Sequence, residues 1–452
     1  MYDTEPAIGH QIEGEFLAAD RASSSTSSMF STFISNLVIP DRGVISDRYE
    51  EITAALNKTF RDTESKTANS LQVGSFGRST AIKGVSDLDL LYIMPVLKWD
   101  EYRDGKQLKL LQDVKAAILK RYPKTKVRVD RLVVTVSYTD FHMEVQPVFE
   151  QKDESFQYPD TGSGGSWKTT KPRAEMDAIS NLDERKNGNL RRLCKMGRAW
   201  KNQHGVPMGG LLLDTLAYNF LNSVVTFDST SFTSCGQMAH DFFEYLENEP
   251  KKDRYAAPGS AQHVKVKTPF QSKAKKARKL AEKALGGGTG ASANKKWKKV
   301  FGREFPAAER AKVALKSDSV PQWRDTEEFI EDSYPVDIRY TVKIDCEVVQ
   351  SGFRPNSLRE MLRGKFPLVR GNQLTFNIAS LDVPQPYEVK WKVLNRGDKA
   401  RRRDEIRGEV VSDAGYQKRV ERTSFTGEHV VDCYILKDGV VVAKDRIHVP
   451  VK

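Results

Sequence analysis

The sequence lacks a long apolar run. No stretch of its 452 residues approaches the roughly 18 to 20 consecutive apolar residues that a helix needs to cross a bilayer. The N-terminal segment MYDTEPAIGHQIEGEF is polar and acidic, so it lacks the basic start and apolar core of a signal peptide. We therefore expect a cytoplasmic protein with no membrane association.

Cysteine is also scarce. The four cysteines, Cys194, Cys235, Cys346 and Cys433, form no CxxC pair, and no cluster of cysteine and histidine has the spacing of a zinc site. A disulfide framework is not expected in a reducing cytosol. We expect four free thiols that are buried or partly buried.

Acidic residues are outnumbered by basic ones. The chain has 72 lysines and arginines against 60 aspartates and glutamates, which gives a formal net charge of +12. A basic protein attracts polyanions such as nucleotides, nucleic acids and acidic partners, but charge alone does not select among them. The helix predicted at 273–285 should place Ala274, Ala277, Leu280, Ala281 and Ala284 on one side and its charges on a solvated face, and contact with nucleic acid or an activating partner is the alternative. The Arg-rich segment 399–405 is expected to be a mobile surface loop, with a ligand or partner site as the alternative.

The pattern of apolar residues changes along the chain, which is too long for one ordinary core. Short strands are predicted at 70–73, 88–94, 127–138 and 141–149, with a helix that starts at Asp47 and another at 106–121, and this indicates an α/β unit. Helical periodicity dominates the residues from 174 to 250. Strand patterns follow, with a hairpin signal at Asp438-Gly439. We predict an α/β lobe with an N-terminal helical segment at 1–172, a helical lobe at 173–325 and a mostly antiparallel, sandwich-like β domain at 332–452.

One stretch, GSFGRSTAIKGVSDLDLLYI, combines residues that suit phosphate chemistry. Gly74 allows a tight turn and close approach of the backbone to a phosphate, and the Ser75 hydroxyl adds a donor. Phosphoryl transfer needs such donors near a triphosphate, together with divalent cations that neutralise its charge.

Asp87 and Asp89 follow in an apolar strand. Residues i and i+2 of a strand point to the same face, so the two carboxylates lie side by side and need a cation or a shared proton. Hard oxygen ligands suit Mg²⁺ or Mn²⁺, and a third carboxylate would allow two metal ions. Glu144, in the apolar strand FHMEVQPVF, is the best candidate, with Asp130 and Asp140 as rivals.

These residues resemble the signature of the DNA polymerase β-like nucleotidyltransferases at Gly74, Ser75, Asp87, Asp89 and Glu144. The context GSFGRSTAI…SDLDLL, which includes Arg78 and Ser86, is more similar to the CD-NTases. Those enzymes are relatives of cyclic GMP-AMP synthase and oligoadenylate synthase that make signalling nucleotides in bacterial anti-phage (CBASS) systems. The resemblance implies that Ser86 positions the Asp pair or approaches the phosphates, and that Arg78 binds nucleotide.

The resemblance extends downstream. The segment RLCKMGRAWKNQ resembles the family's central helix, in which Arg198, with Lys195 and Lys201 nearby, would contact the triphosphate; the family more often has lysine at position 198. In GGLLLDTLAY, Asp214 would orient these basic residues and Tyr218 would stack on a base. The segments YEVKWKVLNRG and VVVAKDRIHVPV resemble the C-terminal adenylyl/guanylyl and SMODS sensor domain.

The resemblance implies a nucleotidyltransferase lobe at 1–172, a helical lobe at 173–325 that completes the nucleotide cleft, and a sensor-like domain at 332–452. It further implies a monomer that joins ATP and other ribonucleoside triphosphates into a cyclic di- or trinucleotide, which activates a downstream effector. Two Mg²⁺ or Mn²⁺ ions would bind Asp87, Asp89 and Glu144. The alternatives are a primer-dependent RNA or protein nucleotidyltransferase, and a non-catalytic sensor of nucleotide or nucleic acid.

Overall fold

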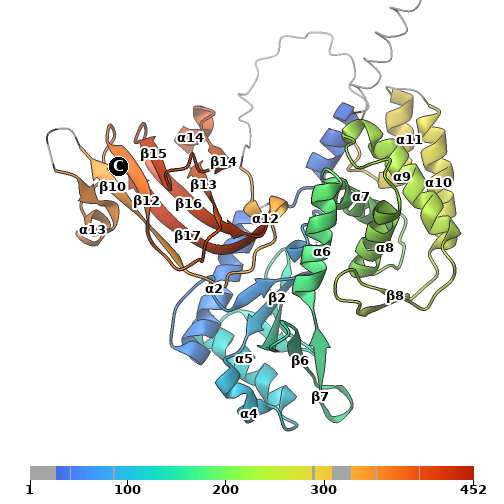
Figure 1. The fold of residues 1–452 in the computed structure, drawn as a ribbon, viewed down its shortest axis with the longest axis horizontal. Helices are drawn as coiled ribbons and strands as arrows, with labels where there is room; N and C mark the ends of the chain where they lie inside the picture. Colours follow the sequence, from blue (N-terminus) through green and yellow to red (C-terminus); the bar gives the residue numbers. More distant parts are fainter. Residues whose placement is uncertain are drawn as a thin grey trace, which may run out of the picture. The chain divides into compact units, whose positions relative to one another are not determined.

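The computed structural model describes residues 27–40, 42–84, 87–287, 291–307, 327–350, 352, 354–396 and 398–452 (Figure 1). These residues form two compact units. The first takes its described residues from Met1–Asp41, Gly74–Leu88 and Thr170–Ala314. The second takes them from Arg42–Val73, Asp89–Thr169 and Leu315–Lys452.

The first unit is mainly helical. Its backbone is helical over 27–36, and its other elements are α3 (Gly74–Gly77), α6 (Pro172–Arg185), α7 (Asn189–Gln203), α8 (Gly210–Ser223), η3 (Phe232–Ser234), α9 (Cys235–Asn248), β8 (Arg254–Ala256), β9 (His263–Lys265), α10 (Gln271–Leu285) and α11 (Ala291–Phe301). β8 and β9 pair as a two-stranded hairpin.

The core of the helical unit follows the predicted apolar faces. The residues that recur at three- and four-residue spacing along α7 are all buried: Leu190, Leu193, Cys194, Gly197 and Trp200. Gly197 lets α8 approach closely, because a Cβ atom at this position would lie 3.0 Å from the Leu213 side chain. The helical segment at 27–36 packs into the same core through Phe30 and Phe33, which contact the ring of Phe301.

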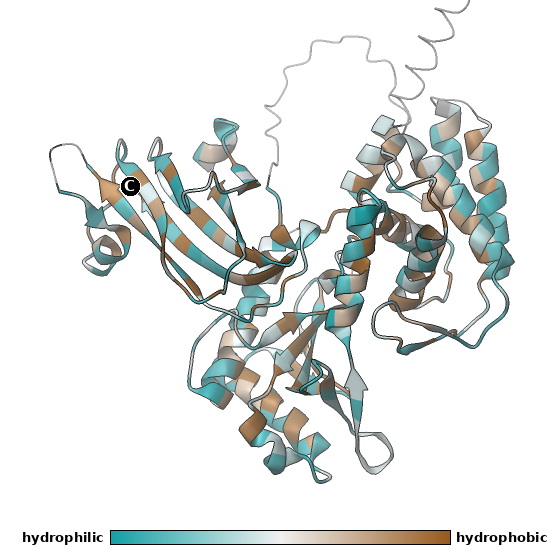
Figure 2. Cartoon of the chain, in the orientation of Figure 1, coloured by the Kyte–Doolittle hydropathy of each residue, from teal (hydrophilic) through white to brown (hydrophobic). Residues whose placement is uncertain are grey.

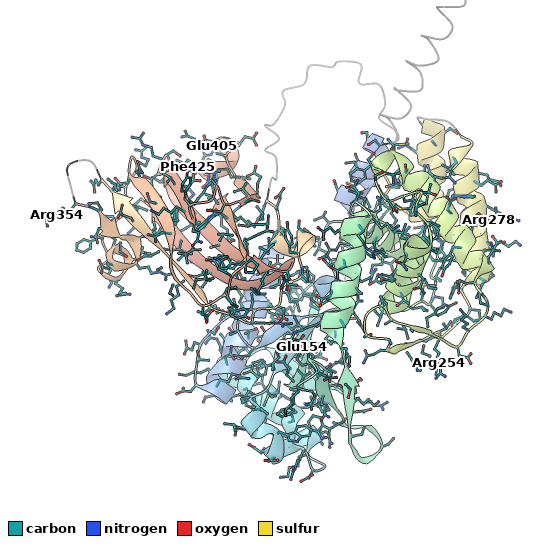
Figure 3. All side chains as sticks on the ribbon, viewed as in Figure 1. Glu154, Arg254, Arg278, Arg354, Glu405 and Phe425 are labelled. Carbon is teal, nitrogen blue, oxygen red and sulfur yellow. The ribbon has the colours of Figure 1, made fainter. Side chains whose placement is uncertain are left out.

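The basic helix α10 presents its alanines to this core. Ala274, Ala277 and Ala281 are buried, as the sequence pattern predicted. Part of its positive charge is paired within the unit, since Arg278, labelled in Figure 3, and Lys275 both form ion pairs with Glu247 on α9. This pairing reduces the charge that α10 presents to a polyanion.

The second unit contains a seven-stranded sheet covered by helices. Its strands are β1 (Ser70–Gln72), β2 (Asp87–Ile93), β3 (Lys126–Val129), β4 (Val134–Ser137), β5 (His142–Glu150), β6 (Phe156–Asp160) and β7 (Ser166–Thr170), and its helices are α2 (Arg42–Arg61), η1 (Val96–Lys98), α4 (Trp99–Tyr102), α5 (Gln107–Arg121) and η2 (Gly162–Gly164). The strand order is β1-β2-β5-β4-β3, and β6 joins β5 to β7. β2 begins in the first unit and continues into the second.

Two local predictions differ from the structure. The segment 127–138 was expected to be one strand, but it forms the antiparallel pair β3 and β4. The turn closes where the Asp130 amide donates to the Val133 carbonyl at 2.9 Å, and the Asp130 carboxylate accepts the amide of Arg131 at 2.6 Å. Helix α2 also begins at Arg42, before the expected start at Asp47.

The C-terminal part of the second unit consists of two four-stranded antiparallel sheets, as predicted. Their strand orders are β11-β10-β12-β15 and β14-β13-β16-β17. The elements are α12 (Ile330–Ser333), β10 (Val342–Val349), β11 (Asn356–Ser357), α13 (Leu358–Arg363), β12 (Gln373–Leu381), β13 (Glu388–Asn395), α14 (Asp398–Arg402), β14 (Arg407–Ser412), β15 (Lys418–Arg422), β16 (Gly427–Lys437) and β17 (Val440–Val451). Figure 2 shows the alternation of apolar and polar residues along these strands.

Turn chemistry accounts for the longest hairpin of this domain. Asp438 (φ 51°) and Gly439 (φ 75°) both adopt left-handed backbone conformations between β16 and β17, as the Asp-Gly signal predicted. The segment 399–405 was expected to be a loop, but part of it belongs to the short helix α14.

Residues just before β10 connect the two parts of the second unit. Leu71 of β1 forms an isolated antiparallel bridge with Asp337, and Val336 forms a parallel bridge with Val441 of β17. Leu71 is completely buried. The free edge of β1 is therefore covered by the segment that leads into the β domain.

Two further expectations concern membrane-spanning helices and the state of the cysteines. Within the described residues, no helix is both long and apolar enough to cross a membrane. The four cysteines are free and buried, as predicted.

Candidate active site

The aspartate pair lies at the start of β2. Asp87 is exposed and Asp89 is half-buried, whereas Leu88 and Leu90 between and after them are buried. The alternation of a strand therefore turns both carboxylates away from the side on which Leu90 packs. This is the arrangement that the Asp-x-Asp spacing predicted.

Glu144 lies on β5, the neighbour of β2 in the sheet. Its flanking residues Met143 and Val145 are completely buried, and they pack in the same core cluster as Leu90. Because neighbours along a strand point to opposite faces, Glu144 and Asp89 both project from the face opposite this core. The three predicted carboxylates thus share one face of two adjacent strands.

The two rival carboxylates lie outside the strands. Asp140 is exposed in the turn between β4 and β5, where the Tyr138 amide donates to the Phe141 carbonyl at 2.9 Å. Asp130 lies in the β3–β4 turn and accepts the Arg131 amide. Because neither residue lies in a strand, the alternation of side chains that turns Glu144 towards the face of Asp89 does not apply to them.

The Gly-Ser turn directly follows the edge strand that pairs with β2. The amide of Val73, the residue before Gly74, donates to the Asp89 carbonyl at 3.1 Å. Gly74 has φ 66°, a left-handed conformation that glycine adopts without strain. The Ser75 carbonyl then accepts the amides of Thr80 (2.9 Å) and Ala81 (3.0 Å), which fold the loop back. Ser86 lies outside the described residues.

A buried network in the helical unit centres on Asp214 of α8, which has no exposed surface. Its carboxylate accepts hydrogen bonds from Arg78 Nε at 3.0 Å and from Thr80 Oγ1 at 2.9 Å. Arg198 of α7 donates to both carboxylate oxygens, through Nη1 to Oδ1 and through Nη2 to Oδ2, the latter at 2.9 Å. The loop after Gly74 is thereby tied to the two central helices.

The two arginines of this network control the protonation state of Asp214. Burial by itself would raise the pKa of Asp214, but the charges of Arg198 and Arg78 and their hydrogen bonds outweigh burial and lower the pKa to about 2. Asp214 is therefore ionised at neutral pH. Its charge in turn raises the pKa of Arg198 against the opposing effect of burial.

Arg198 is occupied by protein groups. Besides Asp214, its guanidinium reaches the carbonyls of Cys194 (3.5 Å) and Gly210 (3.4 Å), and the residue is only 5% exposed. In this structure it holds α7 against α8. Its contact with a triphosphate stays a prediction.

Sequence reasoning missed two members of the network, Thr80 and Glu175. The Glu175 carboxylate lies 3.7 Å from Arg78 Nη1 and accepts a hydrogen bond from the Ser260 hydroxyl at 2.9 Å. Burial raises the pKa of Glu175, and the charge of Arg78 opposes that rise. No local pattern marks these residues, because their partners are far away in the sequence.

The other predicted nucleotide contacts lie on α7 and α8. Lys195 is half-buried. Lys201 donates from Nζ to the Met208 carbonyl at 2.8 Å, and burial, helped by the charge of Arg198, lowers its pKa. Tyr218 is half-buried and packs against the core of the helical unit.

One group of possible metal ligands was not predicted. His240, Asp241 and Glu244 on α9 have ligand atoms within 4.8 Å of one another, the only such group among the described parts of the chain. They stand on successive turns of one helix, and His240 Nδ1 is hydrogen-bonded to Asp241 at 2.9 Å. A solvated helix face has the same composition, so we assign no function to this group.

An Asp pair and a carboxylate on the neighbouring strand of one sheet, together with a helical unit, are features of the DNA polymerase β-like class of nucleotidyltransferases. Residues 25–183 match the Second Messenger Oligonucleotide or Dinucleotide Synthetase (SMODS) domain. Residues 324–452 match the Adenylyl/Guanylyl and SMODS C-terminal sensor domain. The chain belongs to the CD-NTases, as its resemblance indicated.

Two curated relatives are similar to parts of the chain. A Bacillus cereus (strain VD146) protein, named a probable cyclic nucleotide synthase, is 20% identical over 275 residues, which cover 52% of this chain and 82% of the relative. A cyclic GMP-AMP synthase of Escherichia albertii is 30% identical over 98 residues, 22% of each chain.

Solved structures give distant matches. CdnC of E. coli MS115-1 with ATP has a TM-score of 0.48 at 17% identity, with coverage of 62% of this chain and 99% of CdnC. The Vibrio cholerae cyclic AMP-GMP synthase DncV, in complex with the linear intermediate pppA(3′,5′)pG, has a TM-score of 0.43 at 16% identity, with coverage of 67% and 92%.

Proposed function

We propose that this protein joins ribonucleoside triphosphates, ATP among them, into a cyclic di- or trinucleotide and releases pyrophosphate. The SMODS match supports a synthetase of this product class. The observation that carries the assignment of the site is the common face of Asp87, Asp89 and Glu144 on the adjacent strands β2 and β5.

The donor set of this face fits magnesium or manganese. Three carboxylates supply only hard oxygen ligands, which these ions prefer, and the described cysteines are all buried elsewhere. Two bound ions would neutralise the triphosphate and make a ribose hydroxyl easier to deprotonate. Asp87 and Asp89 are the proposed ligands of both ions, with Glu144 as a further ligand of one.

The chain's own groups provide positioning and proton transfer. The backbone at Gly74 and the Ser75 hydroxyl would hold the phosphates, and Ser86 would support the Asp pair. Glu144 would accept the proton of the ribose hydroxyl, whose oxygen then bonds to the α-phosphorus as the bond to the pyrophosphate oxygen breaks. A second attack of the same kind on the bound linear intermediate would close the ring. Most of the rate gain would come from placement and electrostatics.

The helical unit would complete the nucleotide site. Asp214 fixes Arg78 and Arg198 in buried positions. Lys195 and Lys201 would add positive charge for the triphosphate, and Tyr218 would stack on a base. We retain the three predicted domains, 1–172, 173–325 and 332–452, as the functional division of the chain.

The family suggests the biological role of the cyclic product. We propose that the protein acts as a monomer in the cytoplasm, that its cyclic product activates a separate effector, and that this pathway serves bacterial anti-phage defence. Nucleic acid or a protein partner is the proposed activating signal.

The direct test is synthesis without a primer. The protein is incubated with four labelled ribonucleoside triphosphates and Mg²⁺ or Mn²⁺, and the products are treated with phosphatase and separated. A phosphatase-resistant product that disappears in the Asp87→Asn/Asp89→Asn variant supports the proposal. Asp62→Asn is the matched control, because the Asp62 side chain is 93% exposed.

Other outcomes would change the assignment. If product forms only when RNA or a protein acceptor is added, the enzyme is a primer-dependent transferase. If the double variant retains full activity, the Asp pair is not the catalytic site. If neither acceptors nor duplex DNA or RNA yields pyrophosphate, the sensor alternative replaces the synthase.

A further inference from the structure

The face of the sheet that carries Glu144 continues beyond β5, over β4 to β3. Arg128 of β3 stands opposite Thr135 of β4, and Thr135 stands opposite Glu144. Their neighbours along the strands pack in the core on the other face: Val127, Val129, Val134, Val136, Met143 and Val145. Because side chains alternate along a strand, Arg128, Thr135 and Glu144 share one face.

A second row of polar residues lies beside the first. Lys126 of β3 pairs with Ser137 of β4, and Ser137 pairs with His142 of β5. Thr135 in the first row is buried, but Ser137 is half-buried, and Lys126 and His142 are exposed. Diagonal neighbours in an antiparallel sheet lie about 7 to 8 Å apart, so a bound molecule can extend from Glu144 over Ser137 to β3.

Two cations at the β3 end of these rows have no charge partner within the described parts of the chain. The strands of this sheet contain three lysines and arginines, namely Lys126, Arg128 and Lys168. Lys168 forms an ion pair with Asp160 of β6. The exposed side chains of Lys126 and Arg128 form no hydrogen bond or ion pair with any described residue, so their charges are available to an anion.

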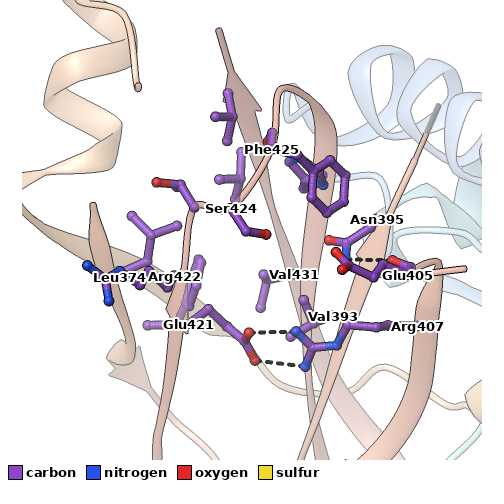
Figure 4. Close-up of a pocket in the computed structure, with 15 residues that line it drawn as sticks. Leu374, Val393, Asn395, Glu405, Arg407, Glu421, Arg422, Ser424, Phe425 and Val431 are labelled. Carbon is purple, nitrogen blue, oxygen red and sulfur yellow. Dashed lines mark hydrogen bonds and ion pairs between the residues drawn. The ribbon is translucent and has the colours of Figure 1, made fainter. Parts of the chain in front are cut away.

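Two arginines on strands of the C-terminal β domain are instead neutralised by carboxylates. In the pocket between its sheets, Arg407 of β14 donates two hydrogen bonds to Glu421, at 2.6 and 2.9 Å, drawn as dashed lines in Figure 4. Arg446 of β17 is paired with Asp432 in the same way, at 2.6 and 3.1 Å. Arg128 differs because no carboxylate of the described chain pairs with it.

The proposed reaction requires two nucleotides on this face. The Asp pair on β2 and its metal ions would hold the triphosphate of the nucleotide that is attacked. Glu144 would take the proton of the attacking hydroxyl, which puts the ribose of the second nucleotide at β5. The 5′-phosphates leave a ribose in a different direction from its 2′- and 3′-hydroxyls, and the two triphosphates repel each other. The second triphosphate is therefore directed away from β2, and β4 and β3 lie on that side of β5.

The strand spacing and the residue types suit a triphosphate. Neighbouring strands lie about 4.8 Å apart, so β3 is about 10 Å from β5. A ribose and its phosphates extend over a comparable length. Arginine binds phosphate oxygens through a planar fork of donors, and lysine binds them as a point charge. The Ser137 hydroxyl and the His142 ring add hydrogen-bond donors along the path.

We propose that Lys126, Arg128, Ser137 and His142 bind the 5′-triphosphate of the acceptor nucleotide, whose ribose hydroxyl attacks. The inference rests on the proposed function, because it gives the second substrate of that reaction its place. The site acts in formation of the first bond. In ring closure the triphosphate of the linear intermediate is itself attacked, so it must first leave this site for the metal ions.

Binding is tested without any reaction. Calorimetry measures the affinity of ATP and adenosine for Asp87→Asn/Asp89→Asn in EDTA, where no metal ion holds a triphosphate. Adding Lys126→Met/Arg128→Met removes two charged hydrogen bonds and should weaken ATP binding by about tenfold or more, with adenosine unaffected. Lys124→Met is the control, because Lys124 is exposed in the turn before β3. Unchanged ATP affinity, or no ATP binding at millimolar concentration, would overturn the proposal.

The distribution of products tests the site in the active enzyme. With ATP and adenosine together, mass spectrometry measures the ratio of products begun on ATP to the product ApA, which is begun on adenosine. Lys126→Met/Arg128→Met should lower this ratio by about tenfold or more, whereas Arg128→Lys and Lys124→Met should keep it. Charged residues on an edge strand also prevent pairing with other chains. If that is their whole role, the variant aggregates, the ratio stays constant and the site is rejected.

Ring closure separates the two nucleotide positions. The rate at which purified pppApA is closed should be the same in wild type and in Lys126→Met/Arg128→Met, while formation of pppApA slows. An equal loss in both steps would assign the two cations to the attacked triphosphate and contradict the proposal. If the wild-type protein forms no product with any acceptor, the proposed function fails, and the calorimetry alone decides the phosphate site.

Discussion

Arg198 and Asp214 form a two-bonded ion pair between α7 and α8, and both side chains are buried. Arg78 approaches the same carboxylate from the loop that follows Gly74. One buried aspartate therefore compensates two buried arginines, with Glu175 as a more distant second anion. The stability of the helical unit should therefore depend on the charge of Asp214.

Asp214→Asn should strongly destabilise the protein. The substitution keeps the shape of the side chain but leaves two guanidinium groups buried without their charge partner. Breaking a buried pair in this way costs about 3 to 5 kcal/mol in the free energy of unfolding, which urea denaturation measures. The exposed Asp253→Asn is the control and should change this free energy by less than about 0.5 kcal/mol. A variant as stable as the control would show that the arginines find other partners.

The contribution of Asp214 should depend on pH in a defined window. Its pKa is lowered from 3.8 to about 2, so its stabilising effect is complete above pH 3.8 and is lost as the pH falls towards 2. That shift corresponds to roughly 2 kcal/mol. The difference in unfolding free energy between wild type and Asp214→Asn should therefore shrink between pH 4 and pH 2. A difference that stays constant through this window would contradict the lowered pKa.

Glu144→Gln should distinguish the third carboxylate from its rivals. Loss of one electrostatic group at the reacting centre typically lowers kcat by about 100- to 1,000-fold, and we expect a decrease of that size in pyrophosphate release. Asp140→Asn and Asp130→Asn, which change residues in turns, should retain near wild-type rates. If Asp140→Asn is the inactive variant, the third ligand is Asp140 and the assignment of Glu144 is wrong.

The two lysines of α7 should separate in their effects. Lys201 is held by the Met208 carbonyl, so Lys201→Met should mainly lower stability, by about 1 to 3 kcal/mol. Lys195→Met should instead raise the KM for ATP by about tenfold or more, because a charged hydrogen bond to phosphate is lost. Steady-state kinetics and melting curves on both variants test the split. A raised KM in Lys201→Met with unchanged stability would show that Lys201 contributes only its charge to the triphosphate and that its contact with the Met208 carbonyl does not stabilise the fold.

Local pattern predicted the elements that carry the candidate site. Strands at 70–73 and 88–94 and the buried face of α7 depend on side-chain periodicity, which a sequence displays directly. The division of 127–138 into two strands was missed because apolar residues continue on both sides of Asp130 and Arg131, so the segment resembles a single strand. The hydrogen bonds of Asp130 with Val133 and Arg131, which the sequence does not display, define the turn between β3 and β4.

Long-range pairing could not be predicted in the same way. Arg78 and Asp214 are 136 residues apart, and nothing near either residue indicates the other. The resemblance suggested that Asp214 orients basic residues, but it gave no sign of Thr80 or Glu175. The alignment of Arg128 with Glu144 was likewise invisible, because it requires three strands to pair in register.

The bridge between Leu71 and Asp337 means that one matched family domain covers a sheet edge of the other. A chain truncated before residue 327 would leave β1 as an open sheet edge, with unpaired amides and a newly exposed leucine, which favours aggregation. The sensor domain is joined to the synthetase domain through its β-sheet as well as through the chain.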